Sequence, residues 1–341
     1  MIRRYGETDF ITGLRAIAAF MVMIVHTNAF ASFGPLGQTV SQAGRYGVDI
    51  FFVISGFTIA ATYAGAGSYR PFLIRRLWRI APLYWCVIAL SFVLLWAEGS
   101  AHAHLQNLVL HLSFLSYLDG RIANSLPGGE WTIPVEVFWY ALLPFLLMRL
   151  NTWKGTLVAL LICAVLTALA KAASKELFST SLYAFWLPIS HATGFLLGAY
   201  AFALRPKLSA LSGRQRSGLV AGAWALFVLG LVQDSAQGEL FALSIFLLLI
   251  ALRTGICTNI LSTRLLLFLG TISYSLYLIH LVVMKFWHVL GQQPFEGLLG
   301  LAGLAAITIA LSTLTYLLIE APTNRIGARI AHQRRGDAAR G

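Results

Sequence analysis

Two titratable side chains and one arginine interrupt long apolar stretches of this sequence. Arg15 and His26 share one stretch, and Glu136 lies in the segment WTIPVEVFWYALLP. A charged or titratable group inside a bilayer costs roughly 2.5 kcal/mol or more, so such residues usually serve a function. An imidazole beside a carboxylate can act as an oriented general base or as a nucleophile. We therefore take His26 and Glu136 as candidate catalytic residues.

The expected depths of these residues in the membrane favour a contact. Eleven helical steps separate Arg15 from His26, which corresponds to about 16 Å along a helix axis and places His26 in the outer half. Glu136 is expected about 7–8 Å from the outer end of its helix, at nearly the same depth as His26. The alternative is that the imidazole and the carboxylate only bond to backbone carbonyls, or to each other, and tie two helices together.

Arginines cluster in the segment YRPFLIRRLWRIAPLYW, which precedes the core of an apolar run. Guanidinium groups bind phosphates in bidentate fashion. Arg75, Arg76 and Arg79, together with Arg15, are therefore candidates for holding a phosphate-rich donor at the cytoplasmic face. The alternative is that the cluster only anchors the chain to anionic lipid headgroups.

Three further residues are candidate substrate contacts. His280 follows Tyr277 in TISYSLYLIH, near the middle of a helix that could line the same cavity, although a packed core histidine fits equally well. Asp49, in GRYGVDIFFVISGFTI, could keep the outer mouth open or pair with Arg45. We assign Ser55, in the same segment, to close helix packing.

A metal site is not expected. The histidines of the outer loop have no cysteine and no clear carboxylate at ligand spacing. They are His102, His104 and His111. The cysteines are odd in number, far apart and within or next to apolar runs, which is typical of inert packing residues. They are Cys86, Cys163 and Cys257.

The composition requires that these residues belong to a membrane protein. Of 341 residues, 58% are hydrophobic and 11% are charged, against about 45–50% and about 25% in a soluble domain. One bilayer crossing takes roughly 20 apolar residues, so the chain has room for about ten. The net charge of +12 is typical of cytoplasmic membrane-protein loops, and because no basic-aromatic motif is present we expect no nucleic-acid binding.

Apolar runs predict an all-α integral membrane protein with about ten transmembrane helices. We place these at 11–31, 47–64, 79–97, 131–150, 155–173, 186–204, 217–233, 239–253, 268–290 and 297–319. The run 107–118 is too short to span and is assigned to a re-entrant or interfacial segment. Trp131 and Trp186 fall where an interfacial aromatic belt is expected.

The positive-inside rule sets the predicted orientation. With ten crossings and both termini cytoplasmic, nineteen of the 25 lysines and arginines lie on the cytoplasmic side. The chain then forms a single transmembrane domain, 1–341, with a basic cytoplasmic tail over about 321–341.

Six motifs together resemble one family. They are DFITGLRAIAAFMVMIVH, GVDIFFVISGFTI, FLIRRLWRIAPLYW, WTIPVEVFWYALLP, ISYSLYLIH and IEAPTNRI. In this order and spacing they resemble the membrane-bound acyltransferase-3 family over about residues 8–330. The resemblance implies that Arg15 and His26 form the family's Arg/Lys-then-His motif and that Glu136 is the acidic residue of its Trp-Thr-x-x-Val-Glu motif. The clustered arginines fall in its arginine motif.

The resemblance also implies an activity. Members transfer an acyl group, usually acetyl, from cytoplasmic acyl-CoA to a hydroxyl of a polysaccharide or lipid-linked glycan at the bacterial inner membrane. Acetyl-CoA would be the donor substrate, with its phosphates on the arginines. His26 would act as a general base or an acyl relay, oriented by Glu136. The chain is similar to stand-alone members that acetylate exopolysaccharide.

The sequence leaves three points open. A member without a periplasmic esterase-like domain either acylates the glycan itself or passes acetyl to a separate periplasmic partner or synthesis complex. A carrier that moves glycan or acyl groups without catalysis is an alternative, because intramembrane His and Glu also serve transporters. A scaffold for a synthesis complex is the third reading, and it predicts tolerance of substitution at Arg15 and His26.

Overall fold

The computed structural model describes residues 9–208, 211–233, 237–251 and 260–338. Within these ranges the chain forms helices and connecting turns and no strand, which confirms the all-α prediction for the described part. Cys257, which the sequence assigns to packing, lies outside the described residues.

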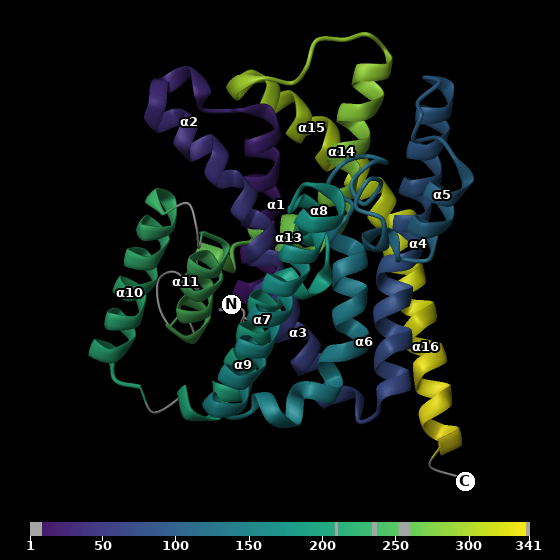
Figure 1. Ribbon diagram of the computed structural model, residues 1–341. Helices are drawn as coiled ribbons and strands as arrows, with labels where there is room; N and C mark the ends of the chain where they lie inside the picture. Colours follow the sequence, from purple (N-terminus) through teal and green to yellow (C-terminus); the bar gives the residue numbers. More distant parts are fainter. Residues whose placement is uncertain (1–8, 209–210, 234–236, 252–259, 339–341) are drawn as a thin grey trace.

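Figure 1 shows the helices of the described ranges. They are α1 (Asp9–Thr27), η1 (Ala31–Phe33), α2 (Gly34–Ala43), η2 (Gly44–Tyr46), α3 (Gly47–Ala66), α4 (Tyr69–Ala97), α5 (Leu105–Leu112), η3 (Ser116–Leu118), α6 (Thr132–Leu150), α7 (Trp153–Phe178), α8 (Leu182–Phe185), η4 (Pro188–His191), α9 (Ala192–Leu208), α10 (Gly213–Val232), α11 (Gln237–Ala251), α13 (Arg264–Thr271), α14 (Ser273–Val289), α15 (Gly297–Thr315), η5 (Tyr316–Glu320) and α16 (Ala321–Ala338).

The helices are those of a multi-pass membrane protein. Within the described residues, seven helical stretches are long and apolar enough to cross a membrane, or eight if the bent pair α13–α14 forms one span. Two of the predicted crossings correspond to shorter helices, α9 with 17 residues and α11 with 15. The count of ten and the cytoplasmic placement of both termini stay predictions.

Three segments differ from the sequence expectations. The arginine segment lies within a helix that begins ten residues before the predicted crossing at 79, because α4 begins at Tyr69 and carries Pro82 in its interior. A proline is tolerated there because neighbouring helices can satisfy the freed backbone group. The segment 34–43 forms the helix α2, which hydropathy did not indicate. The basic tail begins as the helix α16, which packs against α4 where Gly327 meets Trp78.

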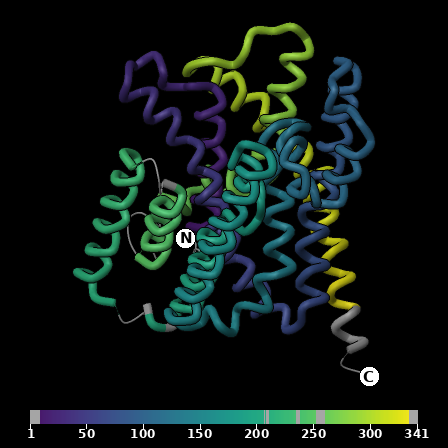
Figure 2. The backbone as a smooth tube through the Cα atoms, in the orientation of Figure 1, coloured from purple at the N-terminus to yellow at the C-terminus, as the bar shows by residue number. Residues whose placement is uncertain are grey.

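The core lies between α1, α3, α4, α6, α9 and α14. The most extensive contact joins α3 and α9, and a Cβ at Gly56 or at Gly198 would meet a backbone carbonyl of the facing helix. Small residues at such contacts allow helix backbones to approach closely in membranes. By contrast, only 11% of the apolar window of α7, and the same share of α10, is buried inside the protein. The helix α10 stands at the edge of the bundle (Figure 2), and both helices would face lipid.

Candidate functional site

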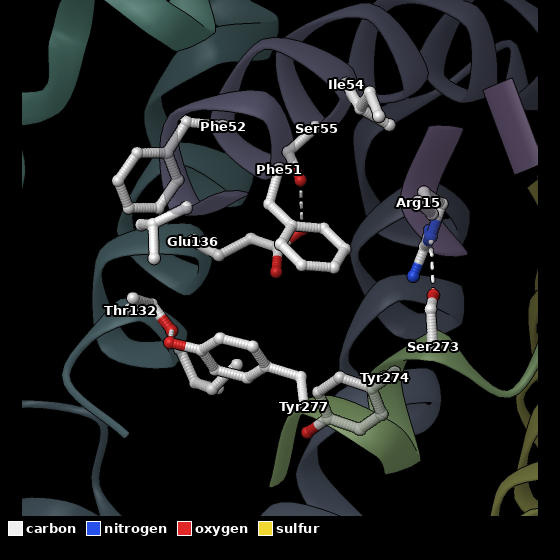
Figure 3. Close-up of a pocket in the computed structure, with 12 residues that line it drawn as sticks. Arg15, Phe51, Phe52, Ile54, Ser55, Thr132, Glu136, Ser273, Tyr274 and Tyr277 are labelled. Carbon is white, nitrogen blue, oxygen red and sulfur yellow. Dashed lines mark hydrogen bonds between the residues drawn. The ribbon is translucent and has the colours of Figure 1, made fainter. Parts of the chain in front are cut away.

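A break between α13 and α14 holds Arg15 in place. The two helices meet at an angle of 65°. Gly270 lies against α1, since a Cβ there would meet the carbonyl oxygen of Thr12. This approach brings Ser273, the first residue of α14, to Arg15, whose Nε donates to the Ser273 Oγ over 3.0 Å (Figure 3). The sequence predicted one continuous helix over 268–290, because hydropathy does not register a change of helix direction.

A second irregularity positions Glu320. The π-turn η5 joins α15 to α16, and turns of this kind are frequent at functional sites. Glu320 is 3% exposed and accepts a hydrogen bond from the Ser275 hydroxyl of α14. The Thr315 hydroxyl donates in turn to the Ser275 Oγ over 3.1 Å. A buried carboxylate thus links α14 to the joint between α15 and α16.

Arg15, Arg79 and Glu320 line one cavity of about 670 Å³, which we call the Arg79 cavity. Asn324, from α16, lines it as well. Two guanidinium groups and one carboxylate leave a net positive lining, which suits an anionic group such as a phosphate.

Arg76 has a different place. It is 4% exposed, and its Nη2 donates to the Thr58 carbonyl at 2.5 Å and to the Thr62 hydroxyl at 2.6 Å, both on α3. The guanidinium also lies 5.3 Å from the centre of the Tyr140 ring on α6. Arg76 therefore joins α4 to α3 and α6 rather than facing the Arg79 cavity.

The structure thus divides the four arginines that the sequence grouped together. Arg15 and Arg79 share a cavity, whereas Arg76 is directed into the packing and Arg75 donates from Nε to the Pro71 carbonyl at 3.3 Å on its own helix. The physical reason is that successive positions on a helix point in different directions. A cluster in sequence does not remain a cluster in space.

Glu136 lies in a second cavity of about 480 Å³, the Glu136 cavity, which Arg15 also lines. Its Oε1 accepts hydrogen bonds from the Ser55 hydroxyl at 2.6 Å and from the Tyr140 hydroxyl at 2.7 Å. Figure 3 shows the Ser55 contact and Tyr277 across the pocket. Ser55, assigned from sequence to helix packing, is therefore a direct partner of the carboxylate.

A third and larger cavity of about 1930 Å³, the His26 vestibule, lies beside His26 and Asp49. Trp131 and Trp186 line it as well, with ring centres 5.5 Å apart. These tryptophans, expected in an interfacial belt, thus present aromatic rings to a cavity. Tyr277 lines both this vestibule and the Glu136 cavity.

The Tyr277 side chain is fixed at this boundary. Its hydroxyl donates to the Gly129 carbonyl at 2.8 Å and accepts from the Thr132 hydroxyl at 3.0 Å. The three cavities therefore follow one another, with Arg15 shared by the first two and Tyr277 shared by the last two.

His26 is hydrogen-bonded to a second histidine. The His280 Nδ1 lies 2.9 Å from the Leu276 carbonyl, which can only accept, so this nitrogen carries the proton. In a neutral imidazole the His280 Nε2 then holds a lone pair. It lies 3.1 Å from the His26 Nδ1, which must donate to it. The free lone pair of a neutral His26 is consequently on Nε2, and His26 is exposed to the vestibule whereas His280 is fully buried.

The expected contact between His26 and Glu136 is not formed. Their hydrogen-bond partners are His280 for the first, and Ser55 and Tyr140 for the second. The helix α3 packs against both α1 and α6, and Glu136 shares its cavity with Arg15. Counting helical steps gives a depth but neither the direction of a side chain nor an intervening helix, which is why the expectation was wrong.

Sequence reasoning did not assign Glu320, Ser273 or Ser55 to the site. Glu320 is an acidic residue at the end of an apolar run, and that signal alone could have identified it. The two serines carry no such signal, because a serine in an apolar helix commonly bonds its own backbone.

Two of the outer-loop histidines have partners within that loop. His104 accepts from the Asn107 backbone N–H at the start of α5, and His111 contacts Glu130 at 3.2 Å. In the part of the chain that the structure describes, no group of three or more His, Cys, Asp or Glu side chains is arranged to hold a metal ion.

Comparison with known proteins finds one matching family and several related membrane or acetyl-transfer proteins. A family model described as acyltransferase domain matches residues 8–317. The chain is 27% identical to the putative membrane-bound transacylase BcsY of Komagataeibacter xylinus, over 91% of this chain and 81% of that protein. It is 28% identical to the exopolysaccharide production protein ExoZ of Rhizobium meliloti, over 83% of this chain and 90% of that protein. A putative O-acetyltransferase of Staphylococcus aureus is 25% identical, over 94% of this chain and 58% of its own length. No solved structure matches.

Proposed function

The chain belongs to the acyltransferase family whose model it matches, and on that premise we propose that it transfers acetyl from acetyl-CoA to a glycan hydroxyl at the bacterial inner membrane. The observation that carries the proposal is a row of three neighbouring cavities that share lining residues, with two arginines at the first cavity and His26 at the last. The relatives named for exopolysaccharide production and O-acetyl transfer support a glycan acceptor.

The donor enters from the Arg79 cavity, which faces the cytoplasm in this proposal. Arg15 and Arg79 hold the CoA phosphates by charge-assisted hydrogen bonds. The pantetheine arm passes through the Glu136 cavity, where the carboxylate accepts a hydrogen bond from an amide N–H of the arm. The distance from Arg15 to His26, about 16 Å along α1, matches an extended arm.

The acceptor occupies the His26 vestibule. The His26 Nε2 takes the proton from the acceptor hydroxyl as its oxygen attacks the thioester carbonyl carbon. The carbon–sulfur bond breaks, and the thiolate of CoA takes the proton back from the imidazolium. His280 accepts the Nδ1–H of His26 throughout, so it fixes the tautomer and stabilises the imidazolium, as the carboxylate does in a serine-protease triad.

A covalent route uses the same geometry. The His26 Nε2 attacks the thioester carbonyl carbon and the carbon–sulfur bond breaks, which gives an acetyl-imidazolium and the CoA thiolate. The acceptor oxygen then takes the acetyl group, its proton passes to the thiolate, and neutral His26 is restored. Rapid acid quenching with labelled acetyl-CoA and no acceptor distinguishes the routes. Label bound to the protein and released by hydroxylamine supports the relay, whereas unlabelled protein supports direct transfer.

The carrier alternative gains one structural observation, the 65° break between α13 and α14. Broken helices are common at transporter binding sites. A carrier predicts movement of glycan or acyl-CoA across the membrane without formation of free CoA, whereas an acyltransferase releases one CoA for each acetyl transferred.

The experiment that tests the proposal uses sealed inside-out vesicles. Acetyl-CoA with labelled acetyl is added to the exposed cytoplasmic face, and label in lipid-linked or polymeric glycan is measured together with free CoA. We expect transfer by the wild type and by His102→Ala, whose histidine is exposed in the outer loop, and about 10³-fold less by His26→Ala at equal protein abundance. Transfer by His26→Ala at the wild-type rate would contradict the role of His26, and glycan movement without free CoA would favour the carrier.

A further inference from the structure

A groove along α2 continues the His26 vestibule. The groove has a volume of about 850 Å³ and is lined by Gln38, Thr39 and Gln42 of α2 and by Leu231 at the end of α10. Arg45 and Tyr46 line both the groove and the vestibule. The groove and the vestibule therefore adjoin at these two residues.

The sequence of α2 gives the helix separate polar and apolar faces. Gln38, Thr39 and Gln42 are spaced by one, three and four positions and fall on one side of the helix. Leu36 and Val40 lie about 110–150° from the middle of this side and are 76% and 45% exposed. An amphipathic helix of this kind lies in the membrane interface with its apolar side toward lipid, so its polar side opens to water and headgroups.

A third face of α2 fixes the helix on the protein. Gly37 and Ser41 are buried, and the Ser41 hydroxyl accepts from the Phe30 backbone N–H at 2.9 Å. A Cβ at Gly37 would meet the Phe30 carbonyl. The groove is therefore built on a docked helix at the end of the bundle opposite the end of α16 (Figure 1).

The groove lining suits neutral hydroxyl groups. Amide and hydroxyl side chains both donate and accept hydrogen bonds, as do the hydroxyls of a sugar. Among the described residues that line the groove, Arg45 is the single charged side chain. A lining with one cation fits a neutral ring better than a cluster of anionic headgroups, which would require several cations.

We propose that the α2 groove binds the sugars next to the one acylated in the vestibule, so that the acceptor is a glycan chain rather than a single sugar. This proposal rests on the proposed function. The polar face from Pro35 to Gln42 runs for about 10 Å along the helix, enough for about two sugar rings beyond the reacting one. The tryptophans Trp131 and Trp186 provide stacking faces inside the vestibule, and the amides of Gln38 and Gln42 bond the sugars outside it.

The test varies the length of the acceptor. Surface polysaccharide from the source cells is de-O-acylated with mild alkali, partly hydrolysed and separated into fragments of one to ten sugars. Transfer of labelled acetyl to each fragment is measured with the full-length purified protein in lipid nanodiscs. We expect kcat/KM to rise by about tenfold once a fragment fills the vestibule and the groove.

A matched pair of variants assigns this gain to the groove. Gln38→Ala/Gln42→Ala should reduce the ratio of kcat/KM between long and short fragments by about tenfold, through KM. Leu36→Ala/Val40→Ala changes the opposite face of the same helix and should keep the wild-type ratio. Gel filtration confirms that both variants are folded.

Two outcomes would contradict the proposed sugar binding in the groove without contradicting the proposed acyl transfer. One is a wild-type rate that does not depend on fragment length, and the other is a glutamine double variant that slows short and long fragments equally. If label reached none of the fragments, the glycan acceptor of the proposed function would itself be wrong. A loss of transfer in Leu36→Ala/Val40→Ala alone would show that α2 acts through lipid contact.

Discussion

Two buried histidines of this protein make the same backbone hydrogen bond, but their Nε2 partners differ in exposure. His280 on α14 and His111 on α5 each donate Nδ1–H to the carbonyl four residues earlier, at 2.9 Å in both cases. Each then presents Nε2 to a partner, His26 at 3.1 Å in the first case and Glu130 at 3.2 Å in the second. His26 is exposed to a cavity, whereas Glu130 is 0% exposed.

The difference between the two pairs separates an accessible imidazole from a packed one. The His280 Nε2 accepts from His26 and leaves the second nitrogen of His26 free for chemistry. The His111 Nε2 faces a carboxylate oxygen, so the pair must hold a proton between them, and the same oxygen accepts from the Leu126 backbone N–H at 3.0 Å. Burial of a histidine is therefore not by itself evidence of a functional site. What distinguishes the two pairs is the exposure of the hydrogen-bond partner, His26 in one pair and Glu130 in the other.

The largest effect should come from His26→Ala. Because general acid–base catalysis contributes about 10²–10⁴-fold, we expect transfer to fall by about 10³-fold, measured as labelled acetyl in glycan. The vestibule is open enough to admit free imidazole, which should restore part of the rate.

The matched variant for this experiment is His111→Ala. Its cavity is closed, so imidazole should not change its rate. If imidazole changed the rates of the two variants equally, the exposure of His26 would not explain its effect on transfer. The functional difference between the two histidine pairs would then be contradicted.

A smaller effect is expected for the positioning residue His280. In His280→Ala, His26 loses the acceptor of its Nδ1–H, and its tautomer is no longer fixed. We expect kcat to fall by about 10–100-fold, as for removal of other orienting partners, with KM for acetyl-CoA unchanged. His280→Gln keeps one donor and one acceptor and should recover part of kcat. A merely structural role predicts instead a lower unfolding temperature and no recovery by glutamine.

Hydropathy predicted the helices well because membrane crossing is a property of local composition. The predicted crossings 79–97 and 131–150 end at the last residues of α4 and α6, Ala97 and Leu150. The same reasoning missed α2, since a short helix with Gly, Pro and Gln has low mean hydropathy. It also missed the break before Ser273 and the π-turn before Glu320, because backbone direction depends on packing between distant segments.

Candidate site residues could be named from sequence, but their partners could not. A histidine or a carboxylate in an apolar run is conspicuous, which is why His26, His280 and Glu136 were singled out. Which of them meet depends on the rotation of each helix about its axis and on the helix between them. Neither quantity is encoded in the residue count from a helix end.

The arginines of α4 extend the contrast between cavity-facing and packed groups. Arg79→Gln removes one of two cations from the Arg79 cavity, and we expect KM for acetyl-CoA to rise by about tenfold, the size of one charge-assisted hydrogen bond. Arg76→Gln removes the guanidinium that bonds both Thr58 and Thr62 of α3, so it should lower the unfolding temperature with little change in KM. The reverse pattern in steady-state kinetics and thermal unfolding would place the phosphates at Arg76.

The smallest effect on transfer should come from the loop pair. Glu130→Ala leaves the His111 ring and the Leu126 N–H without an acceptor in a buried place, and each unsatisfied group costs about 1–3 kcal/mol. The unfolding temperature should therefore fall, while the rate per folded molecule stays within about twofold of the wild type, as expected for a residue outside the site. The connection to the site runs through Gly129, whose carbonyl holds the Tyr277 hydroxyl. A strong loss of kcat at an unchanged unfolding temperature would mean that this loop sets the boundary between the two cavities, and the two histidine pairs would then belong to one functional unit.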